Sequence, residues 1–453
     1  MSCIGGPRRV AGQDAYRIPG RVKRFALATR GLLAELSMSV PGILAVVLAL
    51  GHDMAIAVPP TDSGYAQQTG SVFADPPKLP ITAPAVREMS LPKIDDGTSI
   101  WGATGRDSAG HIWVGISAES AGMSAHLFEY DPVADAWHDH GGVVDRLRDA
   151  GLLREGEGQV KIHSKIVPGD DGWLYFASTD EEGEQEDGSV LPRWGGHLWR
   201  IHPKTRTWEH LLASAEGLVA VSGVGRYVYA LGYWDHVLYQ YDTVEKRVKR
   251  IVVGSVEGHV SRNFIADVRG HVFVPRLTVI RNRLVSASLV EYDQDLNELA
   301  DTPLDYYLDK ERSTGMNHGI VGLAYLPDGR LVFITHAGYL YSIQASGNSP
   351  ALVTGLGWLH PRGKSYTPSL FAWGGDNWLA GVARRSSSVF EWVVSDLDSG
   401  DTTVFPLDTG ELQDVLLYGS ITRDNAGRAY VGGWAADGAH DQRPLLLQIA
   451  PVE

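Results

Sequence analysis

The chain has 453 residues, of which 44% are hydrophobic and 9% aromatic, and it holds 52 glycines, 13 tryptophans and one cysteine. The formal net charge of −14 makes the surface repel polyanions, so we expect no nucleic-acid partner. Glycine marks turns and tryptophan favours half-buried strands, so this composition argues against a helical bundle.

The first 57 residues have the pattern of an export signal. Basic residues precede an apolar run at 36–50, and residues 55–57 (Ala-Ile-Ala) have the small-x-small pattern that a signal peptidase accepts. An uncleaved N-terminal anchor is the main alternative and would be the sole membrane attachment. A wrongly assigned start codon is a third alternative. We therefore predict a secreted or periplasmic protein, with 1–57 as signal peptide or anchor, 58–82 as a flexible lead-in and 83–453 as the folded domain.

After residue 98 one pattern recurs seven times along the chain. It consists of a strand, a tight turn rich in Asp and Gly, and a second strand rich in aromatic and β-branched residues. Five clear copies begin at residues 101, 161, 261, 319 and 418, and two weaker copies begin at 217 and 369. A third strand follows each copy, as in HVLYQYDT at 236, and short polar fourth strands follow, as in TWEHLLA at 207.

Seven repeats of four strands predict an all-β, seven-bladed β-propeller with four-stranded antiparallel blades. The seventh repeat ends with its third strand, so residues near 85–92 (AVREMSLP) are expected to supply the fourth strand and close the ring. A pair of β-sandwiches is the alternative, which two in-phase series of seven disfavour.

The functional face of such a ring is predicted from its loops. First strands begin, and second strands end, on one face, which we call the top face. The longer loops gather there, as at 178–195 and 434–443, whereas the Asp-Gly turns of the opposite face are short. Function is usually placed on loops that a rigid scaffold holds, so we expect the site on the top face.

The predicted top-face rim is cationic, aromatic and rich in histidine. We predict catalytic roles for His163, Arg262, Tyr366 and Tyr418, substrate contacts from Lys161, Lys165, Arg276, Asn317 and Trp434, and metal ligands at His259, His318 and His336. Each residue alone has a structural alternative as a hydrogen-bonded filler between blades, a turn cap or aromatic packing. Their concentration at equivalent ring positions favours a site.

Two local patterns lead to separate expectations. In VKIHSKIV, strand alternation places Lys161, His163 and Lys165 on the channel face, while Ile162, Ser164 and Ile166 pack the other way. The acidic tract 180–187 (DEEGEQED) lacks the ligand spacing of an EF-hand loop, so we expect a solvated surface loop there.

Two resemblances suggest an activity. The D-x-x-G turn followed by an aromatic-rich strand, repeated seven times, resembles the blades of the virginiamycin B lyase family and other NHL-like propellers. The His-rich, Arg-bearing rim is similar to that of propeller polysaccharide lyases of the oligogalacturonate lyase type, in which His side chains hold a divalent metal. The resemblance implies a lyase that acts on an acidic, uronate-containing saccharide.

The rim has the groups that β-elimination requires. The enzyme must neutralise the substrate carboxylate and place a base against the adjacent carbon. Arg262, or a metal held by neutral imidazoles, can do the first, and His163 or Tyr366 the second, while Tyr418 can protonate the leaving oxygen. Mn, Zn or Ca is the candidate metal, and no organic cofactor is predicted.

We therefore expect a carbon-oxygen lyase with a saccharide or other small ligand at the top face. One alternative is a non-catalytic propeller that binds a glycan or a protein partner. The other is a ring-opening lyase like virginiamycin B lyase.

Overall fold

The computed structural model describes residues 82–450, apart from 186–188, 234–235, 257–258, 281–284, 309–318, 348, 374–376, 387–388, 411, 413 and 439–440. The predicted signal segment at 1–57 and nearly all of the predicted lead-in at 58–82 lie outside these residues, so both stay predictions.

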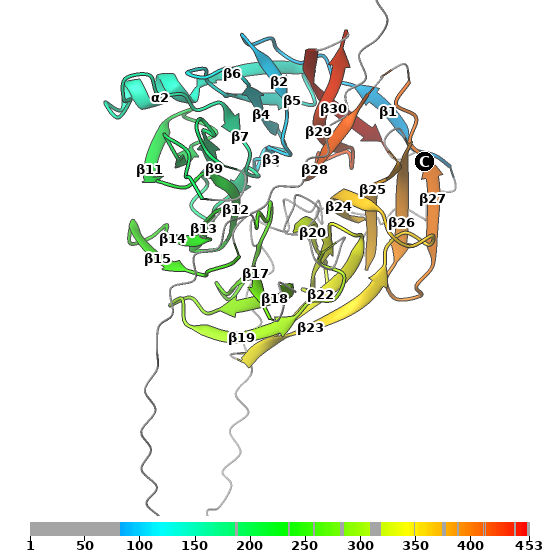
Figure 1. Cartoon of the computed structure of the whole chain (residues 1–453). Coiled ribbons are helices and arrows are strands. Elements are labelled where there is room, and N and C mark those ends of the chain that lie inside the picture. The colour runs from blue at the N-terminus through cyan, green and yellow to red at the C-terminus, as the bar shows by residue number, and fades with distance from the viewer. Residues whose placement is uncertain are drawn as a thin grey trace, which may run out of the picture. The chain divides into compact units, whose positions relative to one another are not determined.

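Seven antiparallel sheets are arranged in a ring, which confirms the predicted seven-bladed β-propeller (Figure 1). Neighbouring blades contact one another through their first strands, and Asn263 of blade four donates hydrogen bonds to the backbone oxygens of Ile320 and Val321 in blade five. The strands of blades one to four are β2 Gly97–Ser99, β3 Thr104–Arg106, β4 Ile112–Ala118, β5 His126–Asp131 and β6 Ala136–Gly142; β7 Lys161–Ile162, β8 Val167–Pro168, β9 Leu174–Thr179, β10 Gly196–Ile201 and β11 Trp208–Ser214; β12 Leu218–Val224, β13 Tyr227–Gly232, β14 Val237–Asp242 and β15 Arg247–Val252; and β16 Ile265–Ala266, β17 Val272–Val279, β18 Val285–Tyr292 and β19 Glu298–Pro303. Those of blades five to seven are β20 Ile320–Tyr325, β21 Leu331–Thr335, β22 Tyr339–Ser346 and β23 Ser349–Trp358; β24 Tyr366–Trp373, β25 Trp378–Ser386, β26 Val389–Asp396 and β27 Thr402–Pro406; and β28 Leu416–Arg423, β29 Ala429–Asp437, β30 Asp441–Ala450 and β1 Ala85–Glu88.

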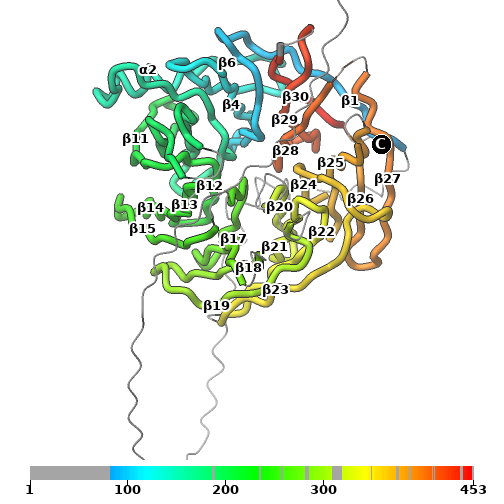
Figure 2. The backbone as a smooth tube through the Cα atoms, viewed as in Figure 1, coloured from blue at the N-terminus to red at the C-terminus, as the bar shows by residue number. Residues whose placement is uncertain are grey.

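The ring is closed by the N-terminal strand, as the sequence predicts. Strand β1 pairs antiparallel with β30, with Ala85 opposite Ala450 and Glu88 opposite Leu447. Figure 2 shows the two ends of the described chain side by side in blade seven. Pairing the first strand with the last covers a sheet edge that would otherwise be open.

The Asp-Gly turns are built by their aspartates. Asp107 Oδ1 accepts hydrogen bonds from the backbone N–H of Ala109 and His111, and Asp267 and Asp424 accept equivalent bonds in blades four and seven. The glycine that follows each of these aspartates has a positive φ, which glycine adopts without steric cost. These turns lie on the face opposite the top face.

The core lies between neighbouring blades, where the first three strands of each blade are mostly buried and the fourth is more exposed. Among the described residues, the one helix is α2 (Val143–Asp149), after blade one. None of the described helical segments has the length and apolar character needed to cross a membrane.

Candidate functional site

The first strands bring five predicted site residues to one small cavity of about 10 Å³ in the middle of the ring. This cavity, which we call the mouth, holds roughly one water-sized group. Its lining residues are Trp101, Gly102, His163, Lys165, Arg262, Asn263, Val321, Tyr366 and Tyr418. The sequence-predicted residues among them are His163, Lys165, Arg262, Tyr366 and Tyr418.

A larger pocket of about 470 Å³ lies beside the mouth, between blades seven, one and two. We call it the side pocket. Trp101 and Tyr418 line both cavities, so the two are neighbours. The side pocket is lined by Thr98, Trp101, Ala118, Glu119, Ala121, Val160, Lys161, Asp180, Glu181, Glu182, Tyr418, Trp434 and Gln442. Lys161 and Trp434, both predicted as substrate contacts, therefore lie in this pocket.

The first strands of blades one and two are interrupted where they reach the mouth. Gly102 lies between β2 and β3 with φ of 84°, and a Cβ at this position would lie 2.9 Å from the backbone oxygen of Tyr418. In blade two, Ser164 lies between β7 and β8, and its Oγ accepts a hydrogen bond of 2.7 Å from the backbone N–H of Ala177. His163 and Lys165, which flank Ser164 in the second break, line the mouth.

The alternation predicted for 160–167 is confirmed only in part, because Lys161 lines the side pocket and residues 163–166 lie between β7 and β8. Ile162 and Ile166 are fully buried in the core between blades one and two, whereas His163 and Lys165 line the mouth. This segment therefore has its isoleucines in the core and His163 and Lys165 in the channel.

Three basic residues near the mouth have no carboxylate partner among the described residues. They are Lys165, which is 8% exposed, Arg262 and Arg384. Burial lowers the pKa of Lys165 to about 8. Arg262 and Arg384 lie over aromatic rings instead, with Cζ 5.6 Å from the ring centroid of Tyr418 and 5.2 Å from that of Tyr366, respectively. An anion at the mouth would meet positive charge without displacing a carboxylate.

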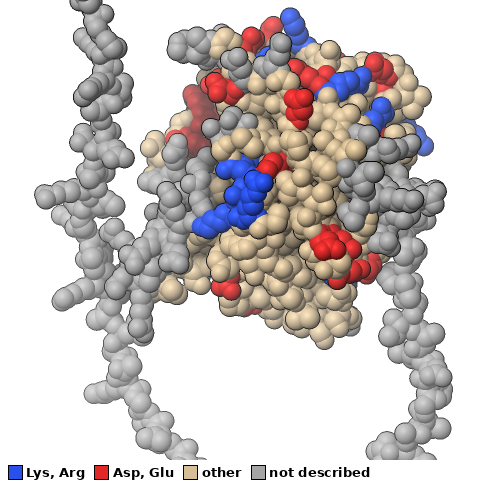
Figure 3. All heavy atoms as spheres, turned by 90° about the vertical axis from the view of Figure 1, so that its right-hand side faces the viewer, with Lys and Arg blue, Asp and Glu red and all other residues tan. Residues whose placement is uncertain are grey.

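Blade six continues this positive charge outward. Arg385, next to Arg384, donates hydrogen bonds to the backbone oxygens of Arg362 and Lys364. Figure 3 views the side of the molecule that carries β26 and β27, and it shows Lys and Arg side chains gathered in one place. Arg384 was not predicted from the sequence, although it lies near the end of a second strand, as His336 directly follows one in blade five.

His163 lies at the mouth as a neutral imidazole. Burial is the main cause that lowers its pKa well below the usual value, and the charges of Arg262 and Lys161 add to the effect. Its Nδ1 lies 3.3 Å from the backbone oxygen of Val219. A carbonyl oxygen can only accept, so Nδ1 carries the proton and Nε2 keeps its lone pair.

Tyr418 is held by three neighbours. The ring of Trp101 lies 4.3 Å from its ring, Arg262 lies over it, and Trp434 Nε1 donates to its hydroxyl oxygen at 3.4 Å. Burial raises the pKa of Tyr418 above its ordinary value, so the phenol keeps its proton at neutral pH.

The acidic tract after β9 corrects one sequence expectation. Asp180 is 1% exposed and lines the side pocket, and Glu181 forms an ion pair with Lys161. This part of the tract is thus a wall of the pocket and not a solvated loop. Burial, with smaller contributions from Glu182 and other nearby carboxylates, raises the pKa of Asp180 to about 6.

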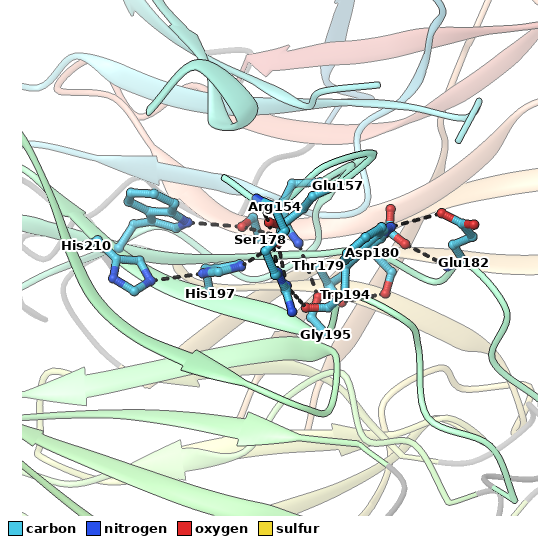
Figure 4. Close-up of polar contacts among 12 residues, drawn as sticks. Arg154, Glu157, Ser178, Thr179, Asp180, Glu182, Trp194, Gly195, His197 and His210 are labelled. Carbon is cyan, nitrogen blue, oxygen red and sulfur yellow. Dashed lines mark hydrogen bonds and ion pairs between the residues drawn. The ribbon is translucent and has the colours of Figure 1, made fainter. Parts of the chain in front are cut away.

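The segment that carries Asp180 is held by a polar network in blade two (Figure 4). Arg154 Nη2 donates to Glu157 Oε1 at 2.6 Å and to the backbone oxygen of Trp194 at 2.7 Å. Trp194 Nε1 in turn donates to Glu182 Oε2 at 2.9 Å. Because these bonds tie 180–182 to 194, the acidic wall has a defined position.

Other predicted site residues lie elsewhere or have existing partners. Arg276 forms ion pairs with Glu298 and Asp301 of the outer strand β19, and it lines neither cavity. His259 is fully buried, with ring nitrogens 2.6 Å from Ser255 Oγ and 2.7 Å from Tyr307 Oη, so a metal would have to displace one of these bonds. The ring of His336 lies 4.7 Å from that of Tyr366. Asn317 and His318 lie outside the described residues.

One group of residues among those described could hold a metal ion, and it is on the face opposite the top face. Asp107, His111 and Glu129 place their ligand atoms within 4.8 Å of one another. His111 Nδ1 lies 2.6 Å from Glu129 Oε1, and in blade four His271 Nδ1 lies 2.7 Å from Glu291 Oε1 after an equivalent Asp turn. The repeat in a second blade indicates a turn-stabilising motif.

No protein-family model matches the chain, and no curated protein matches it. Among solved structures, the extracellular domain of BT4673 from B. thetaiotaomicron is similar at 14% identity with a TM-score of 0.48, covering 80% of this chain and 40% of that one. A chain of the Mitotic Checkpoint Complex is similar at 8% identity with a TM-score of 0.49, covering 84% and 98%. The Dos1 propeller is similar at 10% identity with a TM-score of 0.38, covering 60% and 62%. Likenesses this weak indicate no function for this chain.

Proposed function

We propose that this protein is a lyase that binds an acidic, uronate-containing saccharide at the mouth and cleaves it by β-elimination. The observation that supports this most is the trio of Lys165, Arg262 and Arg384, none of which has a carboxylate partner among the described residues. A buried ammonium without a counter-ion is costly, and a ligand carboxylate would offset that cost. The mouth, at about 10 Å³, suits one carboxylate oxygen.

Aromatic side chains around the mouth suit the rest of a sugar. Trp434 is partly exposed and lines the side pocket, so a sugar ring can stack on it. The ring of Trp101 is already packed against His163, Tyr418 and Lys161. The sugar would then lie across Tyr418, which separates the mouth from the side pocket.

The proposed step assigns three roles. His163 Nε2 takes the proton from the carbon next to the carboxylate, whose negative charge Arg262 and Lys165 stabilise. The electron pair of that C–H bond forms a double bond to the neighbouring carbon, whose bond to the glycosidic oxygen breaks. Tyr418 gives its phenolic proton to this oxygen. The products are an unsaturated uronate and a saccharide with a new hydroxyl, and His163 returns the proton to Tyr418 through solvent.

Non-catalytic binding of a glycan is the second candidate. It is favoured by the narrow mouth and by His163, which is 9% exposed, because a reacting carbon must reach a buried base. Binding alone needs only the cations and the aromatic rings.

A substrate screen with two variants tests the proposal. Polygalacturonate and other uronate polymers are incubated with the full chain, and ultraviolet absorbance reports unsaturated products. We expect His163→Gln to retain binding and to lose about 100-fold or more in rate. We expect Arg262→Gln to lose binding. A polymer that binds without any absorbance change would establish the binding candidate, and the absence of binding to every uronate polymer would overturn the proposal.

A further inference from the structure

The side pocket has the opposite charge to the mouth. Glu119, Asp180, Glu181 and Glu182 line it, and Lys161 is the one basic residue among its described lining residues. Two of these acids already have basic partners, because Glu181 pairs with Lys161 and Glu182 pairs with Arg193. The charges of Glu119 and Asp180 are not balanced by any described basic residue.

Asp180 is the most informative of these residues because it is buried. Its side chain accepts one hydrogen bond, from the backbone N–H of Glu182 to Oδ1 at 2.8 Å. Among the described residues nothing donates to Oδ2, although the residue is 1% exposed and lines the pocket. A carboxylate oxygen that stands in a pocket wall and receives no hydrogen bond from the protein can accept one from a ligand.

The described carboxylate oxygens of the side pocket are too widely spaced to hold a metal ion together. Among the described residues, only Asp107, His111 and Glu129 bring three ligand atoms within 4.8 Å of one another, and they lie on the opposite face. An organic cation or another hydrogen-bond donor can bridge more widely spaced carboxylates. Trp434, which also lines the pocket, supplies a flat surface for the ring that would carry such a donor.

We infer that the side pocket is a second saccharide subsite that binds an amino sugar with a free ammonium group, next to the uronate at the mouth. The inference rests on the proposed function, because it takes the uronate at the mouth as its starting point. The ammonium donates to Asp180 Oδ2 and is attracted by Glu119, while the adjoining carboxylate lies against Arg262 and Lys165. The preferred ligand therefore carries both charges on neighbouring units, and the opposite charges of the two cavities fix which unit enters each.

The test uses two matched probes. One is a disaccharide of glucuronate and glucosamine with the amine free, and the other is the same disaccharide with the amine acetylated. Calorimetric titration of the full chain is expected to give roughly tenfold tighter binding for the free amine, the size expected for one charge-assisted hydrogen bond. Asp180→Asn and Glu119→Gln should each reduce this preference and leave the affinity for the acetylated probe unchanged.

Controls separate this inference from the proposed function. Glu155→Gln removes an exposed acid that does not line the pocket, and it should leave the preference intact. Arg262→Gln should weaken both probes by the same factor. Glu119→Gln changes an exposed residue, so it keeps the test valid if Asp180→Asn fails to fold.

Three results would overturn the inference. Equal affinity for the two probes in the wild type would reject the amino-sugar subsite while leaving the uronate site in place. Calcium binding that Asp180→Asn abolishes, with no amine preference, would make the pocket an ion site. Absence of binding by both probes and by glucuronate alone would reject the proposed function and this inference together.

Discussion

Replacing Lys165 with methionine should make the protein more stable and unable to bind its ligand. Lys165 is 8% exposed, and burial lowers its pKa from 10.5 to about 8. One pKa unit corresponds to about 1.36 kcal/mol, so the charged form costs the folded state about 3 kcal/mol. Methionine has a similar length and no charge, so Lys165→Met should recover much of this energy at pH 7.

The pH dependence gives the sign of the effect. Below pH 8 the folded and unfolded states both hold the proton on Lys165, so the penalty is constant. Between about pH 8 and 10.5 the unfolded state binds a proton that the folded state lacks, so the free energy of unfolding of the wild type rises with pH. The advantage of Lys165→Met should therefore be largest below pH 8 and should disappear near pH 10.5.

Urea unfolding of both proteins at pH 7 and pH 10 measures this difference, and calorimetry with a uronate oligosaccharide measures binding. We expect a stabilised variant with no affinity for the uronate, which is the pattern of a residue kept for function. A variant that is less stable than the wild type at pH 7 would show instead that the ammonium of Lys165 has a stabilising partner.

Three further predictions concern stability. In urea unfolding, Gly102→Ala should lower the free energy of unfolding by about 1–3 kcal/mol more than Gly122→Ala does. Both glycines have a positive φ, but only a Cβ at 102 would contact the backbone oxygen of Tyr418. Equal losses in the two variants would contradict the close contact. Asp180 binds a proton more tightly in the folded state, because its pKa is raised from 3.8 to about 6. The free energy of unfolding of the wild type should therefore fall by about 3 kcal/mol relative to that of Asp180→Asn as the pH rises from about 4 to 7. Parallel pH profiles of the two proteins would contradict this. Glu129→Gln should lower the free energy of unfolding by about 2–4 kcal/mol, because the Glu129 carboxylate is hydrogen-bonded to two histidines. Adding Zn or Mn should not raise the melting temperature of the wild type. A rise that Glu129→Gln lacks would identify a metal site.

The sequence predicts the blades well because each blade carries the same local chemistry. Asp107, Asp267 and Asp424 each form the same side-chain turn, so the repeat shows directly in the letters. Strand alternation also places residues correctly when one face is apolar, as for His163 and Lys165 between Ile162 and Ile166.

The sequence fails where contacts between strands or blades decide the position. Arg276 and His259 were expected at the rim, but Arg276 pairs with acids of the outer strand β19, and His259 bonds to Ser255 and Tyr307. Tyr307 and the two acids of β19 lie more than 20 residues from the side chains that they bind, so the local sequence does not reveal them. Asp180 was missed for a related reason, because a run of acidic residues is typical of a solvated loop, and only the packing against blades one and seven makes it a pocket wall.

A pair of titrations measures whether the mouth is a carboxylate site. One ligand is a trisaccharide of galacturonate, and the other is the same trisaccharide with its carboxyl groups reduced to alcohols. We expect the full chain to bind only the carboxylated ligand, and we expect Arg262→Gln to lose this binding without unfolding. Equal affinity for the two ligands, or unchanged binding in Arg262→Gln, would contradict it.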